Sequence, residues 1–223
     1  MCTQADYWEK VYSEGRQMNR APFDHVVSFL YYNAPRNTPR NETNILELGC
    51  GAGNNLWFAA REGFSVTGID ISQSAIQYAK NRFKEDSLKG EFIVGDFMSV
   101  ANLDKKFDLV IDRGALCYIT FQDAKNVIHS LSQVMKPNSK MLFCPLSDKH
   151  SLCASGTYAD NGMTINMSAK QGEVIHFYNR RDIYELFKEG FSIESLTHVE
   201  KTEMLNENYA LFAEWVVVAK NVR

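Results

Sequence analysis

The sequence predicts an α/β fold in which a doubly wound, mostly parallel β-sheet is covered by helices on both faces. From Ile45 onward, short apolar runs alternate with segments of helical periodicity, as in parallel strands joined by crossover helices. The first apolar run breaks into glycines on alternate positions. The last two strand patterns follow each other with no helix between them, which indicates an antiparallel pair. The 223 residues suit a single domain, 1–223.

A helical cap is expected before the sheet, in residues 1–44. Trp8 and Tyr12 lie one helical turn apart, so their rings share one face of an amino-terminal helix. Pro22 opens a second, apolar helix over residues 23–32, and a Pro- and Asn-rich connector follows it.

Residues 45–146 are expected to form the core of the fold. Strands are predicted over residues 45–48, 66–70, 92–94, 107–111 and 141–144. Ser72 caps the second of three connecting helices, which are predicted over residues 55–62, 73–83 and 122–135. A turn over residues 136–140 precedes the fifth strand.

The alternation stops in an insert, residues 147–180. Asp160-Asn-Gly162 is a strong hairpin turn signal, and strands are predicted over residues 163–167 and 173–178. Inserts of this length are often functional, and we expect a lid here. Residues 181–223 return to regular structure, with a helix and then two strands over residues 182–188, 191–197 and 209–219.

The glycines of the first turn, Gly49, Gly51 and Gly53, form a candidate binding loop. Without a Cβ atom they can take backbone angles closed to other residues, and a ligand can approach the main chain closely. Twenty-one residues after Gly49 a second apolar run ends in Asp70, about where a doubly wound fold places a carboxylate against ribose hydroxyls. The pattern predicts a ligand with a ribose; a purely structural turn is the alternative.

The residues after the loop narrow the choice of ligand. A P-loop would place Lys and Ser or Thr after its last glycine, where this chain has Asn54 and Asn55, so a triphosphate is disfavoured. A dinucleotide loop would have a glycine at Asn54, so NAD is the second choice. The pattern Glu47-Leu-Gly-Cys-Gly-Ala-Gly53, with Asp70, resembles the class I S-adenosylmethionine-dependent methyltransferases.

This resemblance implies a Rossmann-like sheet of seven strands, the last one antiparallel, and S-adenosylmethionine as cofactor. It implies that Asp70 binds the ribose, and that Asp96 and an apolar neighbour bind the adenine. In the thiopurine type of this family, an amino-terminal helix like that of Trp8 closes over the cofactor. The cofactor-binding candidates are Trp8, Tyr12, Gly49, Cys50, Gly51, Gly53, Asn54, Asn55, Asp70, Ile71, Asp96, Phe97 and Asp112.

The sequence Asp112-Arg-Gly-Ala-Leu116 resembles the motif of thiopurine-type and related small-molecule methyltransferases, and it lacks the Pro-Pro-Tyr of enzymes that methylate DNA bases or glutamine. The resemblance implies in-line methyl transfer to an O, N or S atom of a small acceptor, which the insert and Tyr118 would enclose. Such a reaction depends largely on positioning, and it needs a base only when the acceptor must lose a proton. The catalytic candidates are Asp112, Arg113 and His176, with His150 as a further possible base.

Composition excludes several other classes. A formal net charge of −3 with mixed signs predicts no nucleic-acid partner, and no apolar run approaches the ~20 residues of a membrane span. Five cysteines without C-x-x-C spacing predict core thiols rather than disulfides or a metal site. We expect a cytoplasmic monomer or homodimer, with a non-catalytic S-adenosylmethionine-binding module as the alternative to an enzyme.

Overall fold

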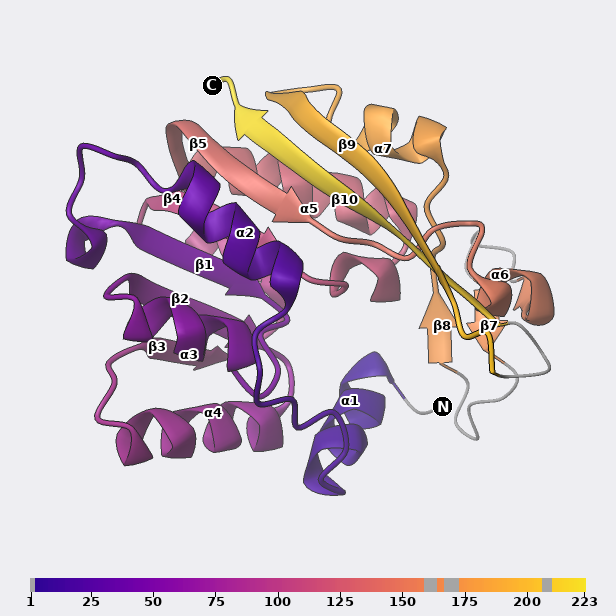
Figure 1. Ribbon diagram of the computed structural model, residues 1–223, viewed down its shortest axis with the longest axis horizontal. Helices are drawn as coiled ribbons and strands as arrows, with labels where there is room; N and C mark the ends of the chain where they lie inside the picture. Colours follow the sequence, from indigo (N-terminus) through magenta and orange to yellow (C-terminus); the bar gives the residue numbers. More distant parts are fainter. Residues whose placement is uncertain (1–2, 159–163, 167–172, 206–209) are drawn as a thin grey trace.

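The computed structural model describes residues 3–158, 164–166, 173–205 and 210–223. Within them the main sheet has seven strands in the order β3-β2-β1-β4-β5-β10-β9 (Figure 1). Strands β1 to β5 are parallel, and β10 is antiparallel to both of its neighbours, which confirms the predicted fold class. The strands are Asn44–Leu48 (β1), Ser65–Asp70 (β2), Glu91–Val94 (β3), Phe107–Asp112 (β4), Met135–Phe143 (β5), Phe191–Thr202 (β9) and Leu211–Asn221 (β10).

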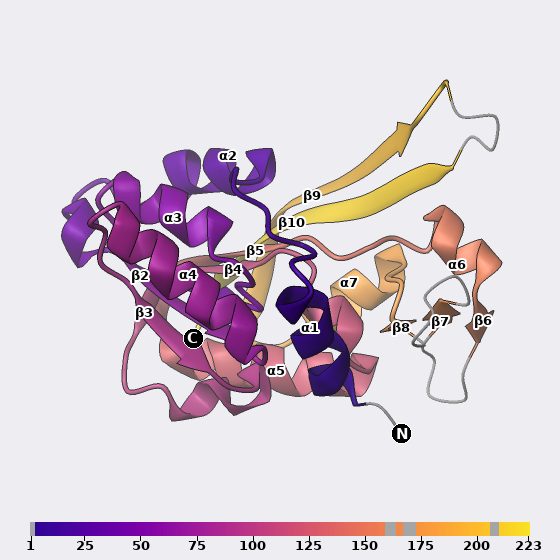
Figure 2. The ribbon, with the colours of Figure 1, turned by 90° about the horizontal axis from the view of Figure 1, so that it is seen from below.

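Helices cover both faces of this sheet (Figures 1 and 2). One face packs against Asp24–Asn33 (α2), Asn54–Arg61 (α3) and Gln73–Glu85 (α4), and the other against Phe121–Val134 (α5) and Arg180–Leu186 (α7). Side chains of β1 alternate between the two cores: Ile45 belongs to the first, and Leu46 and Leu48 belong to the second. Each such fully buried side chain stabilises the fold by about 1.5–3 kcal/mol.

Hydroxyl caps fix the starts of two crossover helices. The Ser72 hydroxyl accepts the N–H of Ala75 at 3.1 Å, as predicted, and Thr120 accepts the N–H of Asp123 at the start of α5. The five helices that were predicted with bounds begin and end within two residues of α2, α3, α4, α5 and α7. Three short 3-10 helices were not predicted: Arg40–Glu42 (η1), Phe97–Asn102 (η2) and Leu116–Tyr118 (η3).

Strand β5 begins at Met135 rather than at the predicted residue 141. Phe107 pairs with Met135, whereas Leu109 pairs with Lys140, so the predicted turn loops out of the strand without ending it. Asn138 has a φ of +62° in this loop. Strand β9 also continues past the predicted residue 197, because its polar second half pairs with β10 in a ribbon that extends from the body (Figure 2).

The insert contains the two predicted strands and two elements that were not predicted. Helix α6 (Ser151–Ser155) and Thr157–Tyr158 (β6) are the unpredicted ones, and β6 forms a three-stranded antiparallel sheet with Thr164–Asn166 (β7) and Glu173–Ile175 (β8). The predicted turn at 160–162 lies outside the described residues. Phe177 and Tyr178 are buried in the main core instead of forming a lid surface.

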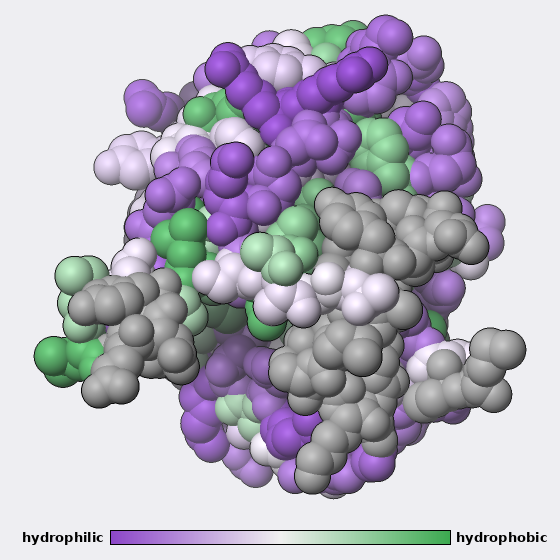
Figure 3. Space-filling model, turned by 90° about the vertical axis from the view of Figure 1, so that its right-hand side faces the viewer, coloured by the Kyte–Doolittle hydropathy of each residue, from purple (hydrophilic) through white to green (hydrophobic). Residues whose placement is uncertain are grey.

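Helix α1 (Gln4–Ser13), α6 and the small sheet all lie where the parallel strands end (Figure 1). In a view towards this end, apolar and weakly polar residues gather around the middle, with hydrophilic residues above and below (Figure 3). Among the described residues no helix is long and apolar enough to cross a membrane. Of the predicted core thiols, Cys50, Cys117 and Cys144 are buried.

Candidate functional site

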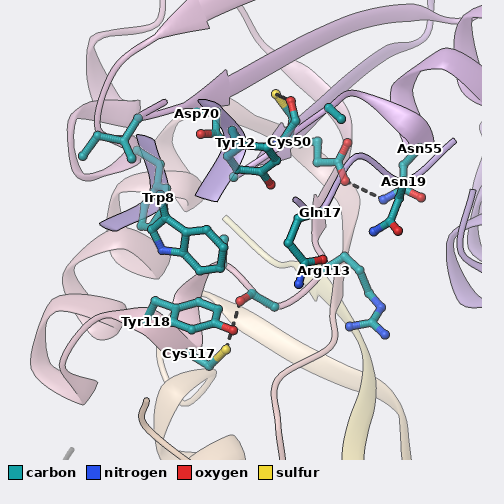
Figure 4. A pocket seen from close by; sticks show the side chains of 18 of the residues that line it. Trp8, Tyr12, Gln17, Asn19, Cys50, Asn55, Asp70, Arg113, Cys117 and Tyr118 are labelled. Carbon is teal, nitrogen blue, oxygen red and sulfur yellow. Dashed lines mark hydrogen bonds between the residues drawn. The ribbon is translucent and has the colours of Figure 1, made fainter. Parts of the chain in front are cut away.

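A cavity of about 460 Å³ opens at the carboxyl ends of the strands, where the strand order reverses between β1 and β4. Polar and aromatic side chains from α1, the loop after β1 and the loop after β4 surround it (Figure 4). The predicted site residues that line it are Trp8, Tyr12, Gly49, Cys50, Gly51, Asn54, Asn55, Asp70, Ile71, Asp96, Phe97 and Arg113.

The glycine loop has the backbone that its sequence requires. Gly49, Gly51 and Gly53 have φ values of +57°, +51° and +73°, which side chains rarely allow. A Cβ atom on Gly49 would lie 2.5 Å from Cβ of Ala115, and one on Gly51 would lie 2.3 Å from the Tyr12 hydroxyl. The loop after β1, the loop after β4 and helix α1 therefore meet at this point.

The Asp70 carboxylate is fixed in the cavity wall. Its Oδ2 accepts the N–H of Gly51 at 2.8 Å, and its Oδ1 accepts the N–H of Ser72 at 2.9 Å. Burial raises the pKa of Asp70, and these two hydrogen bonds oppose the shift. A carboxylate accepts about four hydrogen bonds, so Asp70 keeps acceptor capacity for a molecule in the cavity.

Asn54 and Asn55 hold the chain segment before α2 as well as lining the cavity. Asn54 Nδ2 donates to the carbonyl of Ala21 at 2.8 Å, and Asn55 Oδ1 accepts the N–H of Phe23 at 3.0 Å. Asn55 Nδ2 also donates to Glu47 Oε1 at 2.6 Å. Burial raises the pKa of Glu47 to about 8. Sequence reasoning used Glu47 only as part of a motif and did not identify it as a cavity residue.

Helix α1 forms one wall of the cavity. Glu9 links this helix to the start of α4, a role that the sequence analysis did not predict. The Glu9 carboxylate accepts the Ser72 hydroxyl at 2.7 Å and the N–H of Ser74 at 3.1 Å. Hydrogen bonds from these serines lower its pKa. On the inner face of α1, the Trp8 ring lies 4.8 Å from the Tyr118 ring, centroid to centroid (Figure 4).

Three predicted site residues do not line the cavity. Gly53 lies behind it, packed towards Ala79. Asp112 is fully buried beneath the loop after β4, where its Oδ1 accepts the N–H groups of Ala115 and Leu116 at 3.0 and 2.9 Å. Burial raises the pKa of Asp112 to about 7. Its position corrects the expectation that Asp112 contacts the cofactor or the acceptor, because its side chain turns inward to hold the loop.

His176, the other predicted base, is also absent from the cavity wall. Its ring stacks on Phe121 with centroids 5.3 Å apart, and its Nε2 lies 3.6 Å from Asp182. Packing against α5 and α7 thus places it behind the site. His150, by contrast, lines the cavity.

The cavity has two sides that differ in origin. We call the part near the glycine loop and Asp70 the β1 side. The β5 side is formed by residues near or beyond the ends of β4 and β5, on β10 and before α2: Phe23, Arg113, Leu146, His150, Leu152 and Phe212.

Arg113 is the cationic side chain of the β5 side. Its Nη2 lies 3.0 Å from Oε2 of Glu214, which is only 1% exposed, and its guanidinium lies 4.3 Å from the Phe23 ring centroid. The other Glu214 oxygen is 3.4 Å from His25 Nε2. A buried carboxylate on β10 therefore fixes the guanidinium at the cavity wall. Within the described part of the chain, no cluster of three or more His, Cys, Asp or Glu side chains could hold a metal ion.

A family model described as "Methyltransferase domain" matches residues 45–138. The match spans β1 to α5 and includes the glycine loop and Asp70. Residues 45–138 form an S-adenosylmethionine-dependent methyltransferase domain. Its methyl donor is S-adenosylmethionine.

Curated relatives of the methyltransferase differ in the acceptors they are named for. A putative methyltransferase of Bacillus subtilis, YqeM, is 28% identical over 206 residues, 84% of this chain and 79% of that protein. EEF1A lysine methyltransferase 2 of Danio rerio is 38% identical over 102 residues, 42% and 44% of the two chains. A ubiquinone biosynthesis O-methyltransferase of Salmonella paratyphi A is 30% identical over 104 residues, 46% and 42%. The chain thus spans less than half the length of the last two.

Among solved structures, an S-adenosylmethionine-dependent methyltransferase from Methanosarcina mazei superposes with a TM-score of 0.70 at 20% identity. The match covers 91% of this methyltransferase and 99% of that chain. It supports the fold over nearly the whole length, including the antiparallel end of the sheet.

Proposed function

We propose that this methyltransferase methylates an O, N or S atom of a small acceptor that binds on the β5 side of the cavity. The observation that carries the proposal is that the β1 and β5 sides belong to one cavity, which α1 walls. Its volume of about 460 Å³ lies within the range of small-ligand pockets, roughly 300–1,000 Å³. The β5 side is mainly apolar, with Arg113 and His150 as its ionisable groups.

We propose that the β1 side holds the cofactor. The backbone of Gly49 and Gly51 forms a cradle that a Cβ atom would fill. Glu47 Oε2 is buried, lies at the cavity and has no hydrogen-bond partner among the described residues, which suits an ammonium group. Asp70 would accept ribose hydroxyls, and Asp96 with Phe97 would contact the adenine at the rim.

Asp96 can combine this role with a structural one. Its Oδ1 accepts the N–H of Met98 at 2.9 Å and so caps η2, yet the residue also lines the cavity. Ile71 and Cys50 add apolar contacts on the same side.

The cofactor supplies a sulfonium methyl group that a nucleophile can attack in line. The residues of the chain contribute by orienting the acceptor and excluding water, which can supply much of the rate enhancement of a two-substrate reaction. The Trp8 and Tyr118 rings close one wall, and the Phe23 and Phe212 rings belong to the other side. Neither Asp112 nor His176 reaches the cavity, so we assign neither as the base.

The test is release of S-adenosylhomocysteine with a panel of small acceptors: thiophenol, 2-mercaptobenzoate, catechol, 3,4-dihydroxybenzoate and benzylamine. A pool of proteins and a pool of nucleic acids are assayed in parallel as alternative substrates. We expect turnover with at least one small acceptor and none with the polymers. Methylation confined to a protein or a nucleic acid would refute the small-acceptor proposal. A monomeric or homodimeric state and a cytoplasmic location remain predictions from the sequence.

A further inference from the structure

His150 is held in one orientation at the β5 side of the cavity. It is the N-cap of α6, and its Nδ1 accepts the N–H of Leu152 at 3.1 Å. The main-chain N–H of His150 donates to the carbonyl of Ser147 at 2.9 Å, and the N–H of Leu211 on β10 donates to the Ser151 hydroxyl at 2.7 Å. The short helix and its histidine are therefore tied to the sheet.

Aromatic packing restricts the imidazole ring further. The Phe212 ring lies 5.2 Å away at 73°, and the Phe177 ring lies 5.9 Å away at 43°, centroid to centroid. Burial in this setting lowers the pKa of His150, so the ring is neutral near pH 7. The ring edge opposite Nδ1 carries Nε2, which makes no hydrogen bond to any described residue.

The hydrogen bond from Leu152 determines the tautomer. A neutral imidazole has one nitrogen that donates and one that accepts. Because Nδ1 accepts an N–H, the proton must be on Nε2. If Nε2 were to act as a base in the neutral ring, the proton would have to lie on Nδ1, where it would face the N–H of Leu152. The helix cap thus makes His150, which lines the cavity, a hydrogen-bond donor through Nε2.

The other ionisable group of the β5 side is also a hydrogen-bond donor. Its charged or ionisable groups among the described residues are Arg113 and His150, both donors, and its other members are Phe23, Leu146, Leu152 and Phe212. The neutral amides of Gln17 and Asn19 also line the cavity (Figure 4). The nearby Glu214 carboxylate is directed to Arg113 and His25 and does not line the cavity. A wall with two donors, one of them cationic, and no carboxylate among its described residues suits an acceptor that carries a hydrogen-bond-accepting oxygen, and it disfavours an ammonium group.

We propose that His150 determines specificity as a neutral donor, and that the methyl acceptor carries a carbonyl or carboxylate oxygen that accepts the Nε2–H beside its nucleophilic atom. His150 is then a binding residue and not the general base. The inference rests on the proposed function, since it concerns the acceptor bound in that cavity.

Two substitutions separate donor from base. His150→Asn keeps an oxygen near the position of Nδ1, so it retains the cap of α6 but removes the donor. His150→Gln places an amide N–H near the position of Nε2. We expect His150→Asn to raise the KM for 2-mercaptobenzoate or 3,4-dihydroxybenzoate roughly tenfold, the loss of about one hydrogen bond, and His150→Gln to recover most of it. Both variants should bind S-adenosylhomocysteine like the wild type.

Thiophenol and catechol serve as matched acceptors without the carboxylate. We expect wild-type kcat/KM to favour the carboxylate member of each pair, and His150→Asn to reduce that preference. Equal losses of kcat in both variants, together with loss of the acidic limb of the pH–rate profile, would identify a base and overturn the proposal. A wild-type preference for benzylamine would overturn it as well.

The tautomer can be measured without any acceptor. Long-range ¹H–¹⁵N correlation spectra of the full-length protein with S-adenosylhomocysteine report which ring nitrogen of each of the five histidines is protonated. The signals missing from His150→Asn assign His150. A protonated Nε2 with an unprotonated Nδ1 supports the proposal, and the reverse refutes it. If only polymers are methylated, the small-acceptor proposal fails, while this spectrum still decides the state of His150.

Discussion

The two sides of the cavity are built in different ways. On the β1 side, the proposed binding groups lie at the ends of strands or directly after them, and backbone hydrogen bonds fix them, as in the contact of Asp70 with the N–H of Gly51. On the β5 side, the wall combines residues far apart in the chain, such as Phe23, His150 and Phe212. The first arrangement is local and lies within the segment that the methyltransferase family model matches, whereas the second depends on tertiary packing. Cofactor binding and acceptor binding should therefore respond to different substitutions.

Gly49→Ala should have the largest effect, on the β1 side. Alanine would carry the left-handed backbone penalty, about 1–2 kcal/mol, and its Cβ would overlap Cβ of Ala115. Together with overpacking, we expect the free energy of unfolding to fall by about 2–4 kcal/mol and the cofactor affinity by on the order of 100-fold. Urea denaturation and calorimetry measure these quantities.

Gly15→Ala is the matched control. Gly15 also has a positive φ, +74°, but a Cβ there would meet nothing within 4 Å. The Gly15→Ala variant should lose only the stability that corresponds to the left-handed backbone penalty, and its cofactor affinity should be that of the wild type. If both variants behaved alike, the contact between the two loops would not matter for binding.

Asp70→Ala should weaken the cofactor without changing acceptor selection. The Asp70 carboxylate accepts hydrogen bonds from hydroxyl and N–H groups. Its loss should weaken the binding free energy of S-adenosylhomocysteine by about 1–3 kcal/mol, which raises the Kd roughly 10- to 100-fold. The acceptor KM at saturating cofactor should stay near the wild-type value. Asp104→Ala, an exposed carboxylate away from the cavity, is the control. An unchanged Kd for Asp70→Ala would remove this residue from the binding site.

Glu214→Gln should have the opposite profile. It leaves the Arg113 guanidinium beside a neutral amide in a buried setting, so the cation is no longer held at the β5 side. We expect acceptor kcat/KM to fall roughly tenfold, with cofactor affinity changed less than about twofold. Glu194→Gln, whose pair with Lys140 is partly exposed, should change neither. A parallel loss of cofactor affinity in Glu214→Gln would show that the two sides are not separable.

The sequence predicted most residues that line the β1 side, though not Glu47, because the requirements of this side are short-range. Gly49 and Gly51 need positive φ values within one turn, and Asp70 ends its own strand. The same reasoning missed Glu9, because its partners Ser72 and Ser74 are brought to it only by the packing of α1 on α4.

The β5 side could not be derived in the same way. His150 and His176 both lie in the insert, and only the fold shows that one lines the cavity and the other packs on Phe121. Leu146 and Phe212 come together because the chain after β5 pairs with β10, at Leu146 and Glu214. No local pattern in the sequence indicates such a contact.

Asp112→Asn should change turnover least of all. Because Asp112 holds the loop after β4 from beneath, and asparagine keeps an oxygen for the N–H groups of Ala115 and Leu116, we expect kcat/KM within a few-fold of the wild type. A catalytic base at this position would instead make the variant inactive.

The same variant should alter how stability depends on pH. The folded-state pKa of Asp112 is raised from 3.8 to about 7, so folding favours the protonated form. Its contribution to stability is fully present below about pH 4 and is lost as the pH rises through 7, by at most about 1.4 kcal/mol per pH unit. Urea denaturation of the cofactor-free protein from pH 4 to 8 should therefore show a shallower decline for Asp112→Asn. Glu47, whose pKa is raised to about 8, acts in the same direction, so Glu47→Gln should remove a second part of the slope. If Asp112→Asn and the wild type had equal slopes, the Asp112 carboxyl would not be buried in the way that the loop geometry requires.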